Sequence, residues 1–69
     1  METARPHVLP DAIDRACREG DAKTVLAWVD AGNDVNLLND IRQSLLALTV
    51  FRDLPDLGAA LLARGADPN

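Results

Sequence analysis

The chain has 69 residues, which allows one small domain with a marginal core, because a chain of this length buries only about 60% of its unfolded surface. Seven Lys and Arg against eleven Asp and Glu give a net charge of −4. This balance argues against nucleic-acid binding, which depends on neutralised phosphates, and against a basic helix on a membrane surface. Apolar residues make up 48%, mostly Ala and Leu, a mixture that favours helices over strands.

The cysteine content and the first ten residues indicate the cellular compartment of the protein. Cys17 is the only cysteine, so no intrachain disulfide can form and a reducing compartment is expected. Residues 1–10 contain two prolines and no apolar h-region, and no apolar run approaches the roughly 20 residues that span a bilayer. We therefore expect a soluble protein, cytoplasmic or otherwise intracellular, without membrane contact.

The first half of the chain predicts an extended arm and two helices. Residues 1–10 lack periodicity and are read as the arm. Asp11 is expected to cap a helix whose apolar residues recur at helical spacing, and Gly20 to end it. Asp21 opens a second helix with a wide apolar stripe, and Gly32 ends it. The tight turn between them predicts an antiparallel hairpin.

The second half repeats this order. Residues 33–43 are rich in Asn and Asp and predict a loop. Ser44 is expected to cap a third helix over "LLALTVF", although periodicity alone would also fit a buried strand there. Pro55 fits the first turn of a fourth helix, and Gly65 its end. The alignment of this half with the first half decides in favour of helices.

An internal repeat of 33 residues underlies that alignment. The stretch "AGNDVN" at 31–36 returns as "RGADPN" at 64–69. The expected caps Asp11 and Ser44 are also 33 positions apart. The matching pairs in the two stretches are Gly32 and Gly65, Asp34 and Asp67, and Asn36 and Asn69.

A 33-residue period with a turn and two helices resembles the ankyrin repeat family. The resemblance implies an all-α, ankyrin-like repeat solenoid of two helix-turn-helix units joined by a short hairpin loop. The arm would cover 1–10, a first repeat of the N-terminal cap type 11–36, and a second repeat 37–69.

The chain departs from the family pattern T-P-L-H-x-A-A-x-x-G…V-x-x-L-L-x-x-G-A-D-V-N at several positions. Neither unit keeps the Pro and His of T-P-L-H. Asp53 replaces the glycine between the helices of the second unit, and Arg42 replaces the hairpin glycine. Gly58 replaces a usual valine, at a cost of about 1 kcal/mol relative to Ala within a helix.

Two such units are fewer than the three or so that a stacked array normally needs to bury its apolar faces. Three arrangements would supply the missing contacts: the chain is a fragment of a longer array, the arm caps one end, or another chain covers the open face. The sequence does not choose among them. We expect the isolated chain to be weakly stable or self-associating.

The resemblance implies a protein-binding module without catalysis, which binds through its inner-helix face and hairpin tip. Leu48 and Phe51 stand where the first unit has Arg15 and Arg18, which predicts an apolar patch rimmed by charge. Alternatively, this patch packs against a following repeat or against a second copy of the chain. At the hairpin tip, the alternative to partner binding is that the apolar residues pack only within the loop. The predicted protein-binding residues are Leu38, Asp40, Ile41, Leu48, Phe51 and Arg52.

No catalytic or metal site is expected. Cys17 falls at a core position and His7 in the arm, and zinc sites usually need about four such ligands. The partner would be another protein of unknown identity, with self-association through the open repeat face as a further possibility and no cofactor. Two other functions stay open: a structural or capping piece of a longer array, and an inhibitor that occludes a partner's site.

Overall fold

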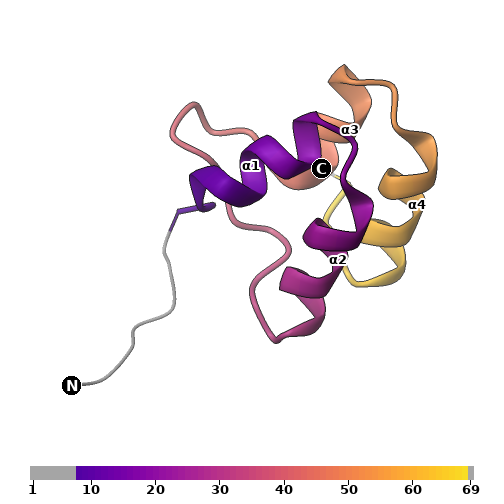
Figure 1. Ribbon diagram of the computed structural model, residues 1–69, viewed down its shortest axis with the longest axis horizontal. Coiled ribbons are helices and arrows are strands. Elements are labelled where there is room, and N and C mark those ends of the chain that lie inside the picture. The colour runs from indigo at the N-terminus through magenta and orange to yellow at the C-terminus, as the bar shows by residue number, and fades with distance from the viewer. Residues whose placement is uncertain (1–7, 69) are drawn as a thin grey trace.

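The computed structural model describes residues 8–68, which form two helical hairpins. Helices α1 (Asp11–Arg18) and α2 (Ala22–Asp30) make the first, and α3 (Leu45–Phe51) and α4 (Pro55–Ala63) make the second. The hairpins lie side by side, with α1 against α3 and α2 against α4 (Figure 1). Most of the expected arm, including His7, lies outside the described residues, as does Asn69.

The all-α prediction is confirmed over the described residues. The segment that resembled a buried strand forms α3, and the only β-type pairing within 8–68 is an isolated antiparallel bridge between Leu38 and Ser44. The helices have only seven to nine residues each. Helices this short are marginal alone in water, so packing between the hairpins must stabilise them.

Three helix starts show how side chains and prolines fix the boundaries. The Asp21 carboxylate accepts from the Thr24 N–H at 3.3 Å, and the Ser44 hydroxyl accepts from the Ala47 N–H at 3.1 Å. The predicted cap at Ser44 is therefore confirmed, and Asp21, which was expected to open the second helix, caps it as well. Hydrogen bonds from the Thr24 hydroxyl and then its N–H hold the pKa of Asp21 below its ordinary value. The prediction for Asp11 is wrong, because Pro10 occupies the N-cap position and Asp11 is already helical.

The ends of the helices repeat one backbone motif. After α1 the Asp21 N–H donates to the Ala16 carbonyl at 2.8 Å, and after α3 the Leu54 N–H donates to the Thr49 carbonyl at 2.8 Å. These are Schellman ends, which place one residue in the left-handed region. The residues that take this conformation after the four helices are Gly20 at φ 77°, Gly32 at 101°, Asp53 at 56° and Gly65 at 92°.

The core lies between the two hairpins. Its most buried side chains are Cys17, Val25, Leu45 and Leu61, with two contributed by each hairpin. Burial and, to a smaller extent, the nearby Asp14 carboxylate raise the pKa of the Cys17 thiol to about 11, against a weaker opposing effect of Arg18. The expected core position of Cys17 is therefore confirmed.

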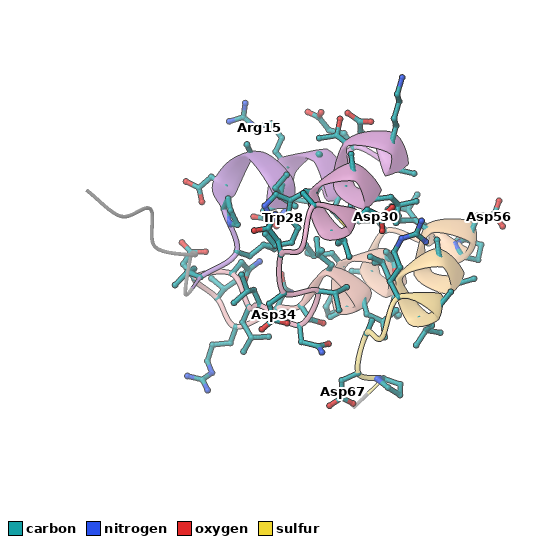
Figure 2. The ribbon with its side chains drawn as sticks, turned by 90° about the horizontal axis from the view of Figure 1, so that it is seen from below. Arg15, Trp28, Asp30, Asp34, Asp56 and Asp67 are labelled. Atoms are coloured by element: carbon teal, nitrogen blue, oxygen red, sulfur yellow. The ribbon has the colours of Figure 1, made fainter. Side chains whose placement is uncertain are left out.

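The two closing turns of the repeat contact each other. The Asn36 side chain accepts from the Asp67 N–H at 2.7 Å and donates to the Gly65 carbonyl at 3.4 Å. Nearby, the Arg64 guanidinium donates to both carboxylate oxygens of Asp30, at 2.8 and 3.2 Å. The recurring segments thus join the hairpins along one edge by polar contacts, and Figure 2 shows Asp30 directed toward the second hairpin.

Gly58 has a packing role in the second hairpin. A Cβ at this position would lie 3.0 Å from the hydroxyl oxygen of Thr49, closer than carbon and oxygen normally approach. The Thr49 hydroxyl is fixed by donating to the Leu46 carbonyl at 2.6 Å. The glycine therefore lets α4 approach α3 closely, which explains a residue that is unfavourable in an isolated helix.

Replacing Asp53 by glycine should stabilise the fold, because a non-glycine residue in the left-handed region is strained. We expect D53G to raise the free energy of unfolding by about 1 kcal/mol in urea denaturation followed by circular dichroism. The matched control is G20A at the equivalent end of α1, where φ is 77°, which should lower stability. A D53G protein less stable than the wild type would contradict the assignment.

The effect of G58A should depend on Thr49. In the wild type we expect G58A to lower stability, because the new methyl group meets a hydroxyl that cannot move freely. In a T49A background the same change should raise stability by up to about 1 kcal/mol, since only the gain in helix propensity remains. Equal effects of G58A in the two backgrounds, measured by thermal or urea unfolding, would exclude the proposed contact.

Cys17 should react slowly in the folded protein. A pKa of about 11 in place of 9.0 lowers the thiolate fraction at pH 8 about 100-fold, and burial adds a barrier to access. The free energy of unfolding should also depend on pH. Because the thiol of the unfolded chain ionises at a lower pH than that of the folded protein, stability should fall as the pH rises from about 9 to 11. Alkylation rates with and without urea, with C17A as the control for the pH profile, test both expectations.

Candidate functional site

The second hairpin exposes an apolar surface on the side that the first hairpin does not cover. We call it the outer face; it consists of Leu46, Ala47 and Val50 from α3 and Ala59 and Leu62 from α4. Val50 is 74% exposed and Leu62 47%. Side chains of this size are normally buried, so their exposure together is the main surface feature to be explained.

Two hollows adjoin on this face and share Leu46 and Val50. The first, of about 430 Å³, lies between α3 and the loop before it, and Leu38, Arg42 and Asp67 also line it. The second, of about 390 Å³, lies between α3 and α4. Besides the outer-face residues, its lining consists of Thr49, Asp53, Leu54, Pro55 and Gly58. The face is therefore a ridge with a hollow on each side, apolar at its centre and charged at its ends.

The 33-residue repeat explains why these side chains are apolar. Cys17, the counterpart of Val50, is fully buried, and its thiol lies 3.7 Å from the Leu45 carbonyl of the second hairpin. Val29, the counterpart of Leu62, is only 8% exposed. At these two positions the side chain is thus buried in the first hairpin and exposed in the second. The outer face is built as a packing surface.

The opposite end of the molecule is polar. Leu48 and Leu57 are 3% and 5% exposed, whereas their counterparts Arg15 and Thr24 are exposed. Figure 2 shows Arg15 on the side of the first hairpin that points away from the second, while Asp67 lies at the other extreme. The two ends of the stack therefore differ: one is solvated and the other is apolar.

The six predicted binding residues do not form one surface. Leu48 is 3% exposed and belongs to the core, so its assignment to an exposed patch is wrong. The comparison with Arg15 was misleading, because Arg15 lies on the side of the first hairpin that points away from the second (Figure 2). Phe51 is 70% exposed but lines neither hollow. Arg52 follows it, with its Nε donating to the Arg18 carbonyl at 3.2 Å.

The loop before α3 places the other three predicted residues at its exposed tip. Leu38, Asp40 and Ile41 are all exposed, and Leu38 also borders the first hollow. Asn39 holds this loop, accepting from the N–H groups of Ile41 and Gln43 at 3.0 and 2.8 Å. The tip is therefore ordered and continues the outer face on one side.

Sequence reasoning missed three residues of this site: Leu46, Val50 and Leu62. A usable signal was present, since each is an apolar residue 33 positions after a core residue of the first unit, Ile13, Cys17 or Val29. That signal identifies the surface only once it is known which side of a hairpin faces its neighbour.

Residues 8–68 contain neither a cluster of metal ligands nor a membrane-spanning helix. Within 8–68 no three His, Cys, Asp or Glu side chains converge to hold a metal ion. No helix there is long and apolar enough to cross a membrane. The pKa of Asp30 is lowered because Arg64 donates to its carboxylate, and that of Arg64 is raised in turn, as expected for an ion pair.

Comparison with known proteins gives no relative for this chain. No family model matches it, and no curated protein or solved structure shows significant similarity. The site geometry and the internal repeat are therefore the grounds for a functional assignment.

Proposed function

We propose that the chain is an ankyrin-like module that binds another protein, without catalysis, through its outer face. The observation that carries the proposal is the exposure of Val50 and Leu62 at positions where Cys17 and Val29 are buried by the next hairpin. A surface with the composition of a core, left open to solvent, is typical of an interface.

The family assignment rests on agreement between repeat and backbone. Asp53 and Arg42, the two residues that stand where the family has glycine, have φ values of 56° and 65°, in the left-handed region that glycine adopts most readily. Helical hairpins with equivalent turns 33 residues apart also fit this type of unit. These features support the ankyrin-like interpretation over an unrelated four-helix bundle.

The binding surface differs from the one inferred from the sequence. Leu48 is buried and cannot contact a partner, and the centre of the proposed surface is Val50 in place of its neighbour Phe51. The loop tip with Leu38 and Ile41 forms one rim of this surface, because Leu38 lines the first hollow. A continuation of a longer array would use the same outer face, so the capping or structural role is the second candidate.

Two adjacent substitutions test the surface. Val50 and Phe51 are 74% and 70% exposed, but only Val50 lies on the outer face. We expect V50D to reduce capture of partner proteins from host-cell extract more than tenfold, and F51D to change it little, since truncating central residues costs most. Captured proteins are quantified by mass spectrometry, and circular dichroism checks that both variants keep their helices.

If F51D reduced capture more than V50D did, Phe51 would be the centre of the binding surface. Equal capture by wild type, V50D and F51D would remove the outer face as a binding surface for other proteins.

A further inference from the structure

We propose that the outer face binds the same face of a second copy of this chain, forming a two-fold symmetric dimer. This inference rests on the proposed function in one respect only, that the outer face is an interface. It adds the identity of the occupant and the relative orientation of the two copies.

The polar end of the molecule excludes the alternative of head-to-tail stacking. In such a stack the outer face would meet the exposed side of the first hairpin, which carries Arg15 and Thr24 where the second hairpin has Leu48 and Leu57. Burying an arginine against Val50 and Leu62 would desolvate a charge without a partner. Self-association therefore brings two apolar ends together, and that pairing is isologous.

The arrangement of the face suits a two-fold axis. The hollows lie on either side of Leu46 and Val50, which line both. A two-fold axis that lies in the plane of the interface, passes over these residues and runs at right angles to the line between the hollows places the first hollow of one copy against the second hollow of the other. Val50 then lies next to its own symmetry mate at the centre of the interface.

The charges at the two ends of α3 are complementary under this symmetry. Arg42 lines the first hollow and Asp53 the second, and no side-chain hydrogen bond or ion pair engages either of them within residues 8–68. The two-fold axis brings Arg42 of one copy toward Asp53 of the other, twice per dimer. Asp67 also borders the first hollow, and its backbone N–H is bonded to Asn36. Charge pairs of this kind fix the orientation of an interface more than its strength.

Sedimentation equilibrium with charge-reversal variants tests this arrangement. We expect R42E and D53R each to raise the dimer dissociation constant about tenfold, and the double variant R42E/D53R to return it to within about threefold of wild type, because the pair is restored with its signs exchanged. E19R, on the exposed end of the first hairpin, changes the net charge as D53R does and should have little effect. V50D should abolish the dimer and F51D should not.

Cysteine cross-linking tests the position of the axis. In a C17A background, V50C should form a disulfide-linked dimer under mild oxidation, and F51C should form much less, since only residue 50 lies near its symmetry mate. Circular dichroism of every variant separates lost pairing from lost folding.

The possible outcomes separate this inference from the proposed function. A monomeric wild type whose V50D variant still loses captured proteins overturns the dimer and leaves the interface with a different partner. If the dimer dissociation constant does not change with R42E or D53R, and if F51C forms more disulfide-linked dimer than V50C, the proposed arrangement is overturned. Restoration by the double variant together with linkage through residue 50 supports it.

Discussion

Burial of one helical hairpin against the next is the interaction on which the rest of this structure depends. Helices of seven to nine residues do not persist alone, and the fully buried side chains come equally from both hairpins. The caps and Schellman ends set where each helix begins and ends, but they satisfy only backbone groups. The apolar contact between hairpins is what makes the four short helices a fold.

The same contact links the architecture to the inferred function. A hairpin that packs on neighbours from two sides needs apolar residues on both, and the second hairpin has them: Leu45 and Leu61 face the core while Val50 and Leu62 remain exposed. The first hairpin is polar on its free side, where Arg15 lies (Figure 2). The free side of the first hairpin is thus polar and that of the second apolar, and the proposed partner would cover the apolar side.

The candidate site was only partly predictable for a related reason. Periodicity marks which residues of α3 are apolar, but all faces of "LLALTVF" are apolar or nearly so, and nothing within the helix distinguishes Leu48 from Val50. The comparison with the first unit assigned Leu48 to the surface because Arg15 is charged. That comparison did not account for the position of Arg15, which is exposed on the side of the first hairpin that points away from the second.

Local sequence was enough to predict the helices, the cap at Ser44, the start of the second helix at Asp21 and the turns that close each unit, because these depend on local hydrogen bonds and on backbone conformations that few residues adopt. It misplaced the start of α1 by one residue, since it gave a carboxylate more weight than the fixed φ of Pro10. Only the tertiary structure decided which side of each helix is buried and why Gly58 stands in α4. Those properties belong to pairs of helices in contact, and a linear pattern does not specify which faces meet.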